Sequence, residues 1–134
     1  MTPSLREAVR RRAEERCEYC HLPASCSILP FEIDHIIPEK HGGPTDLENL
    51  ALACCYCNRF KGPNLSGVDN ESGRIVRLFH PRRDRWGEHF VWQATSLKAL
   101  SPIGRVTVQV LGLNSPGHLR VRGSLADEGI FPFV

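Results

Sequence analysis

The chain has 134 residues, of which 41% are hydrophobic and 24% are charged, a composition typical of a folded globular protein. This composition excludes a collagen-like or wholly disordered chain, and no apolar run reaches the roughly 18 residues that a membrane helix needs. The formal net charge is a modest +2, but it is unevenly distributed along the chain.

The first predicted element is a helix over residues 5–16. Ser4 and Glu7 have the spacing of a capping box, in which the serine caps the helix and the glutamate lies three residues later. Apolar residues then recur at helical spacing. The arginines of this segment are interleaved with glutamates, so we expect them to form a solvent-exposed face.

Residues 17–62 are predicted to contain a strand, a loop, a second strand and a short helix. Residues 31–37 alternate in polarity and are rich in β-branched side chains, as in a short strand. Residues 39–46 contain the turn-forming residues of a loop. Residues 49–53 then return as a second, antiparallel strand. Residues 54–62 form a turn and a short helix, which ends at a Gly-Pro pair.

The remaining residues, 63–134, form a C-terminal extension with a predicted β-hairpin. In chain order its expected elements are a loop (64–73), a strand (74–79), a basic turn (81–85) and a returning strand (88–93). The run that ends at residues 107–111 fits either a strand or a helix. The last dozen residues are expected to trail along the surface.

Six cysteines suggest a metal site: Cys17, Cys20, Cys26, Cys54, Cys55 and Cys57. The N-terminus has no apolar stretch for a secretory signal, so we expect a cytoplasmic, reducing setting that favours metal over disulfides. Cys17/Cys20 and Cys54/Cys57 are two C-x2-C pairs, which together can hold one structural zinc ion in a closed tetrahedral site. Buried, reduced cysteines are the alternative. The other two cysteines have no assigned role.

The basic residues are concentrated in the second half of the chain. Residues 59–122 carry eleven Lys/Arg and four Asp/Glu, a net charge of +7, whereas residues 1–58 have a net charge of −3. This is the natural place for contact with a polyanion. A solvated basic face explains the same composition.

The stretch from Cys17 to Lys61 resembles the HNH endonucleases. The residues that carry the resemblance are Cys17/Cys20, Asp34-His35-Ile36-Ile37-Pro38, Gly42-Gly43, Asn49-Leu50, Cys54/Cys57-Asn58 and Lys61. The third signature position is Asn58 rather than histidine. A second stretch, from Leu78 to Phe90, resembles an extension found in small stand-alone bacterial HNH proteins.

This resemblance implies an α+β fold in a single domain, residues 1–134. Its parts are a ββα-metal core over residues 17–62 braced by the four-cysteine zinc site, the N-terminal helix and the basic extension. The implied activity is metal-dependent hydrolysis of DNA phosphodiester bonds. We expect no membrane partner and no small-molecule substrate.

The resemblance also implies roles for individual residues. His35 is the expected general base, which agrees with the ability of a neutral imidazole to accept a proton from water near pH 7. Asp34 and Asn58 supply oxygen ligands that suit Mg²⁺ or Mn²⁺. Neighbouring strand residues point to opposite sides, so Asp34 and His35 need a bent strand end to act at one centre. Asn49 is expected to hold the loop that follows His35.

Several further residues are candidates for DNA contact or for purely structural roles. Lys61 and Arg59 on the short helix, and Arg82, Arg83 and Arg85 in the basic turn, are candidate phosphate contacts, with plain solvation the alternative for each. Trp86, Phe90 and Trp92 are expected in the core. His80 and His89 are expected to be structural. His21, His41 and His118 are expected to have no special role.

Two other functions fit parts of the sequence. A zinc-knuckle module that binds nucleic acid without catalysis would use the same cysteines and the same basic half. A structural zinc protein that binds another protein would need neither the basic segment nor the histidine. The set Asp34, His35 and Asn58 favours the nuclease, because a pure binding module has no reason to keep these residues together.

Overall fold

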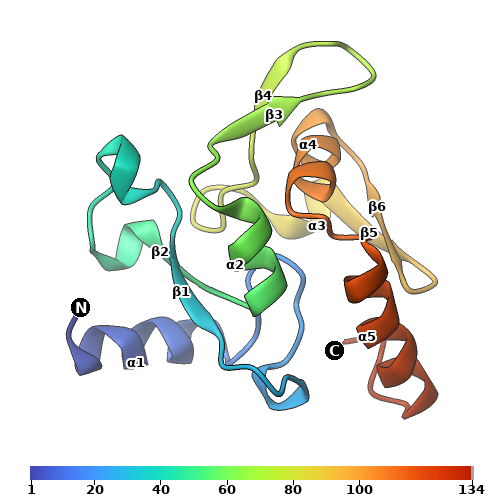
Figure 1. The fold of residues 1–134 in the computed structure, drawn as a ribbon, viewed down its shortest axis with the longest axis horizontal. Helices are drawn as coiled ribbons and strands as arrows, with labels where there is room; N and C mark the ends of the chain where they lie inside the picture. The colour runs from blue at the N-terminus through green and yellow to red at the C-terminus, as the bar shows by residue number, and fades with distance from the viewer. Residues whose placement is uncertain (134) are drawn as a thin grey trace.

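A computed structural model of the chain describes residues 1–133 and shows an α+β fold with three two-stranded antiparallel sheets in those residues (Figure 1). The elements in chain order are α1 (Pro3–Arg12), β1 (Glu32–His35), β2 (Leu50–Ala53), α2 (Cys55–Lys61), β3 (Ser66–Val68), β4 (Ile75–Arg77), α3 (Trp86–His89), β5 (Phe90–Gln93), β6 (Ser96–Ala99), α4 (Pro102–Val110) and α5 (Pro116–Asp127). In this part of the chain no helix combines the length and apolar character needed to cross a membrane.

The predicted ββα unit is present at the centre of the molecule. β1 and β2 pair antiparallel, with Asp34 opposite Ala51 and His35 opposite Leu50. Every residue of β2 is buried, because α1 and β1 pack against it. The α2 helix begins directly after Cys54, whose sulfur accepts a hydrogen bond from the backbone N–H of Cys57. The ββα unit thus places the second cysteine pair at the start of a helix.

The N-terminal helix begins earlier and ends earlier than the sequence predicts. Its N-cap is Thr2, whose hydroxyl accepts a hydrogen bond of 3.2 Å from the backbone N–H of Leu5. Pro3 occupies the first turn, where its missing N–H costs nothing. The capping box predicted from Ser4 is therefore wrong. The helix ends at Arg12, and Glu14 and Glu15 then adopt positive φ angles of 55° that no α-helix continues through.

The extension contains two hairpins rather than the single predicted one. β4 pairs with β3, a strand of three residues inside the predicted loop 64–73, and β5 pairs with β6. The predicted pairing of residues 74–79 with 88–93 is therefore wrong. Each strand pairs with its nearest neighbour in sequence, which needs only a short connection. Figure 1 shows the β3–β4 hairpin projecting from the body of the molecule.

The end of the chain is more ordered than the sequence predicts. The undecided run is helical, since α4 spans Pro102–Val110. The last dozen residues do not trail along the surface throughout, because α5 continues to Asp127 and Leu125 is buried. Beyond the helix, Phe131 is buried with its ring edge-on to Trp92 at 5.0 Å. The end of the chain therefore contributes to the one hydrophobic core of the described residues.

An aromatic cluster joins this extension to the first cysteine pair. The Trp86 ring lies 5.2 Å from that of Phe90 and 5.6 Å from that of Trp92, so the three aromatic residues pack together as expected. The indole N–H of Trp86 donates a hydrogen bond of 2.9 Å to the carbonyl of Tyr19, between the cysteines of the first pair. The neighbouring His21 ring stacks on Trp86 at 4.0 Å.

The β3–β4 hairpin is held to α4 by a buried carboxylate. Asp69 is fully buried and accepts hydrogen bonds from Arg105 at 2.9 and 3.0 Å and from the hydroxyl of Ser72 at 2.8 Å. These bonds, above all those from Arg105, hold the pKa of Asp69 well below its usual value of 3.8. The ionised carboxylate is therefore favoured in the folded protein.

This carboxylate predicts a pH-dependent contribution to stability. The pKa of Asp69 is lower in the folded protein than in the unfolded chain, so its carboxylate stabilises the fold at pH values above about 4, the pKa in the unfolded chain. This stabilisation is lost as the pH falls toward the pKa of Asp69 in the folded protein. Asp69→Asn should therefore lower the melting temperature at pH 7, and the gap to the wild-type protein should shrink as the pH falls below about 4. Thermal melts by circular dichroism at pH 7 to 2 measure this gap, with the exposed Asp127→Asn as the control. A gap that stays constant with pH would contradict the prediction.

Candidate active site and metal centre

The two C-x2-C pairs meet in one buried cluster. The sulfur atoms of Cys17, Cys20, Cys54 and Cys57 all lie within 4.8 Å of one another, and Cys20 and Cys54 are 3.7 Å apart. A tetrahedral zinc site with Zn–S bonds of about 2.3 Å has sulfur–sulfur edges of roughly 3.8 Å. The donor set and its spacing therefore fit a structural zinc ion.

Backbone amides orient the sulfur atoms of this cluster. The N–H of Cys20 points at the sulfur of Cys17 at 3.5 Å, and the N–H of Cys57 points at that of Cys54 at 3.4 Å. Burial raises the pKa of the Cys57 thiol well above its usual range. Cys26 and Cys55 are half-buried and lie outside the cluster.

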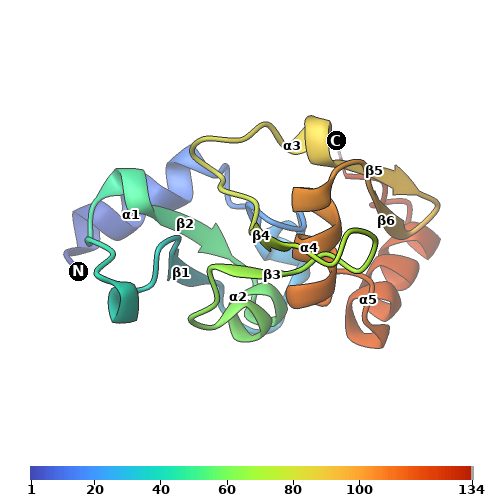
Figure 2. The same ribbon diagram turned by 90° about the horizontal axis from the view of Figure 1, so that it is seen from above.

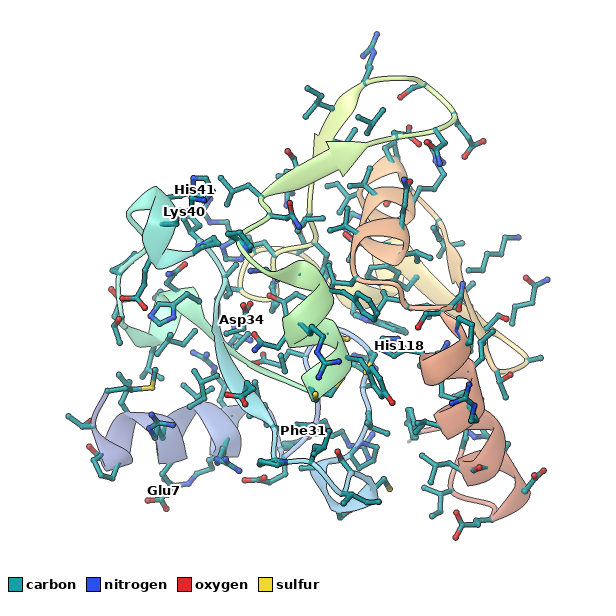
Figure 3. The ribbon with its side chains drawn as sticks, in the orientation of Figure 1. Glu7, Phe31, Asp34, Lys40, His41 and His118 are labelled. Atoms are coloured by element: carbon teal, nitrogen blue, oxygen red, sulfur yellow. The ribbon has the colours of Figure 1, made fainter. Side chains whose placement is uncertain are left out.

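A second feature is an open surface recess of about 290 Å³ beside β1. Its lining residues are Ile33, Asp34, His35, Pro38, Glu39, Asn58, Gly62 and Pro63. The recess is therefore lined both by the predicted base, His35, and by the two predicted metal ligands, Asp34 of β1 and Asn58 of α2. Figure 3 shows Asp34 between β1 and α2, with Lys40 and His41 at the outer end of the loop that follows β1.

His35 contacts two residues of the loop that follows it, Thr45 and Glu39. Its Nε2 atom lies 2.8 Å from the Thr45 hydroxyl and 3.8 Å from a carboxylate oxygen of Glu39. The side chain is 18% exposed, so solvent still reaches the ring. Within residues 1–133, Nδ1 has no hydrogen-bond partner. Thr45 and Glu39 carry no sequence signal for this role, because the fold of the loop brings them to the ring.

Asp34 points into the protein, where Tyr19 and Lys61 bind it. The Tyr19 hydroxyl donates to one carboxylate oxygen at 2.7 Å, and the Lys61 ammonium lies 3.2 Å from both oxygens. The same ammonium donates to the backbone carbonyl of His35 at 3.1 Å. Burial raises the pKa of Asp34, and the charge of Lys61 and the Tyr19 hydrogen bond oppose that shift.

This arrangement corrects the expectation for Lys61. The side chain is only 1% exposed, and its ammonium is engaged by the carboxylate of Asp34 and by a carbonyl. A phosphate on the surface would not reach it. Lys61 instead joins α2 to β1 from inside.

The two residues expected to supply oxygen ligands for Mg²⁺ or Mn²⁺ both line the recess. A carboxylate from Asp34 and an amide from Asn58 line it, and Glu39 adds a second carboxylate at its edge. Within residues 1–133 the four cysteines are the one group of three or more His, Cys, Asp or Glu ligand atoms close enough for a metal. A cation in the recess would thus have few protein ligands. This suits Mg²⁺, which usually keeps several waters.

The loop after β1 is fixed by Asn49. Its side-chain oxygen accepts a hydrogen bond from the backbone N–H of Ile37, and its amide donates to the carbonyls of Ile37 and Pro44, all at 2.9 Å. Gly43 lies within the loop that these hydrogen bonds close, and a Cβ atom on Gly43 would lie 1.6 Å from the carbonyl oxygen of Ile37. The backbone therefore approaches closely enough to require glycine. Asn49 makes the local contacts expected of it.

Arg12 supports the turn that carries Asn49. Its guanidinium donates hydrogen bonds to the carbonyls of Leu47 at 2.7 Å and Leu50 at 2.5 Å, on either side of that residue. These hydrogen bonds connect α1 to the turn that contains Asn49. No sequence motif marks this arginine, which was expected on a solvent-exposed face.

The basic residues predicted to contact DNA lie in different surroundings. Arg59 is exposed on α2, next in sequence to Asn58, with one guanidinium nitrogen 3.7 Å from the sulfur of Cys55. Arg82 is largely buried in an ion pair with Glu18, and burial lowers its pKa to about 10. Arg82 is therefore a structural residue rather than a free phosphate contact.

Arg83 and Arg85 are exposed on the segment before α3. Figure 2 shows this segment on the opposite side of the β1–β2 hairpin from α2. These two arginines therefore lie on the side of the hairpin away from α2.

Three histidines outside the recess have structural contacts. The Nδ1 atom of His80 accepts a hydrogen bond from the backbone N–H of Arg82 at 3.1 Å. His89 lies 2.6 Å from the Ser101 hydroxyl. His118 was expected to have no special role, but its Nε2 atom lies 3.5 Å from the sulfur of Cys57. That contact joins α5 to the cysteine cluster.

Comparison with known proteins identifies the segment that contains both sites. No curated protein matches the chain. A family model for the HNH endonuclease domain matches residues 17–64, which span the cysteine cluster, β1, the loop held by Asn49, and α2. This match agrees with the four clustered cysteines and with the ββα arrangement. Residues 17–64 are thus similar in sequence to the HNH endonuclease domain.

Proposed function

We propose that the protein is a metal-dependent endonuclease that hydrolyses DNA phosphodiester bonds. The observation that supports this most directly is the shared recess of His35, Asp34 and Asn58 within a matched HNH segment. A phosphate placed there would meet a base, oxygen ligands for a cation and the exposed arginine of α2.

His35 is the proposed general base. The Thr45 hydroxyl is placed to accept a hydrogen bond from Nε2–H at 2.8 Å, which leaves the lone pair of Nδ1 free to take a proton from water. The nearby Glu39 carboxylate favours the same tautomer, because it also accepts a hydrogen. General-base help is worth about 10²–10⁴-fold, or roughly 3–5 kcal/mol, so it supplies only part of the acceleration.

Asp34 and Asn58 are the proposed holders of Mg²⁺ or Mn²⁺. When bound, such an ion offsets the charge that develops on the phosphate and on the leaving oxygen. Lys61 keeps the Asp34 carboxylate in place and already neutralises part of its charge. Asn49 holds the backbone that follows His35. Arg59 is the proposed phosphate contact beside the recess. Arg83 and Arg85 would contact phosphates only of DNA long enough to reach the other side of the β1–β2 hairpin.

A zinc-knuckle module that binds nucleic acid without cleaving it is the second candidate. The Lys61–Asp34 ion pair favours it, because a carboxylate that is already paired attracts a divalent cation less strongly. A supercoiled-plasmid nicking assay with Mg²⁺ or Mn²⁺, beside a gel shift on the same DNA, separates the two. Relaxed plasmid supports the nuclease. A shift without any relaxed product from zinc-loaded protein supports the binding module.

The proposed role of Asn58 predicts a change in metal dependence. Asn58→Ala removes an oxygen ligand without altering the zinc cluster, so it should raise the Mg²⁺ concentration needed for half-maximal nicking and lower the maximal rate. Titrating Mg²⁺ in the nicking assay measures both. The matched control is Asn70→Ala, an exposed amide on the β3–β4 hairpin that contacts only Gln109. An unchanged Mg²⁺ titration for Asn58→Ala would exclude Asn58 as a ligand.

A further inference from the structure

The C-terminal helix contacts the cysteine cluster from outside the matched HNH segment. His118, in the first turn of α5, is 4% exposed, and its Nε2 atom lies 3.5 Å from the sulfur of Cys57. Its Nδ1 atom lies 3.2 Å from the hydroxyl of Ser115. If the serine hydroxyl donates to Nδ1, the ring proton resides on Nε2 and points at the sulfur. Figure 3 shows His118 between α2 and α5.

One turn further along α5, Arg122 is a buried cation. It is 2% exposed and donates hydrogen bonds to three neutral acceptors, the carbonyls of Thr95 and Leu113 at 2.6 Å and the Asn114 side chain at 3.2 Å. Within residues 1–133 it forms no ion pair with a carboxylate. A buried charge without an opposite charge nearby is costly.

The cysteine cluster lies beside this arginine. Cys20, His118 and Arg122 line one small enclosed space between the cluster and α5. Burial lowers the pKa of Arg122, and the charges of three neighbouring thiolates oppose that shift. Four thiolates around one Zn²⁺ carry a net charge of −2, whereas four thiols or two disulfides are neutral. The net charge of −2 on the zinc-bound cluster would therefore offset the positive charge of the buried Arg122 guanidinium, and neutral cysteines would not.

We infer that His118 and Arg122 hold zinc in the cysteine cluster from outside the HNH segment. His118 donates its Nε2–H to the Cys57 thiolate, and Arg122 offsets the net negative charge of the loaded cluster. Groups that hydrogen-bond metal ligands commonly change metal affinity by about 10–100-fold when they are removed. Retention of zinc by the nuclease segment thus depends on the last helix of the chain.

Zinc affinity and cysteine reactivity test this inference without any cleavage assay. The full-length chain is loaded with zinc and titrated with a chromogenic chelator, and alkylation of Cys57 by N-ethylmaleimide is followed by mass spectrometry. His118→Ala and Arg122→Met should each weaken zinc binding by about 10–100-fold and speed alkylation of Cys57. His118→Gln, whose amide can still donate, should recover part of the loss. Arg120→Met, on the exposed face of the same helix, is the control.

The outcomes separate this inference from the proposed nuclease. Zinc affinity at the wild-type level in a folded His118→Ala variant overturns it, as does a wild-type chain that binds no zinc. If Arg122→Met does not fold, Arg122→Lys replaces it and should bind zinc more tightly than His118→Ala. Failure of the plasmid assay leaves the zinc measurements, and hence this inference, unaffected.

Discussion

His35→Ala should lower plasmid nicking by at least about 100-fold while leaving the fold and the zinc content unchanged. The substitution removes the proposed base but leaves the backbone of β1, because the Lys61 ammonium bonds to the carbonyl of His35 and not to its ring. The side chain lies at the surface of the recess, so its loss opens no large internal cavity. Nicking rates in Mg²⁺ measure the effect, and circular dichroism and zinc analysis check the fold.

The matched control for this variant is His41→Ala. His41 is an exposed histidine further along the same loop, and its ring contacts only the carbonyl of Pro63 at 3.0 Å. It should nick plasmid at a rate close to that of the wild-type protein. Nicking by His35→Ala at the wild-type rate would exclude His35 as the base.

Cys57→Ser should abolish zinc binding and unfold much of the protein. Structural zinc sites in small domains contribute about 10–16 kcal/mol of metal binding as folding energy, which rivals the roughly 5–15 kcal/mol stability of a whole domain. Cys57 also lies in the first turn of α2 and contacts His118, so its loss affects both the HNH segment and α5. Zinc content and melting temperature should fall together.

Cys55→Ser is a precise control, because it changes the same chemical group two residues away. Cys55 is half-buried and lies outside the cluster. Its replacement should keep one zinc per chain and change the free energy of unfolding by only about 0.5 kcal/mol. A soluble, zinc-free Cys57→Ser protein that melts at the wild-type temperature would contradict a bracing role for the metal.

The parts of the fold and site that the sequence predicts are those with local signals. Each cysteine pair is a contiguous motif, so both pairs and their meeting were predictable from spacing. The two central strands and the helix after them carry clear alternation and a Gly-Pro stop. The position of His35 beside Asn58 follows from that unit and from the HNH resemblance.

The parts that escaped prediction depend on contacts between distant residues. Nothing in the sequence around Lys61 indicates that it is buried, because its partner Asp34 lies 27 residues earlier. The three-residue strand β3 has no signal of its own and exists only through β4. Helix α4 is rich in β-branched residues that favour strands, and packing against β3 and β6 decides its conformation. His118 finds Cys57 across 61 residues of sequence.

The hydrogen bonds of Arg12 have a consequence for moving this domain into other proteins. The matched segment begins at residue 17, yet the turn that carries Asn49 is held by a guanidinium five residues before it. A graft cut at the limits of the family match would leave two backbone carbonyls of that turn without their donor. Domain borders drawn by sequence similarity alone would thus omit part of the scaffold, and a transplantable unit has to include the helix that precedes the first cysteine.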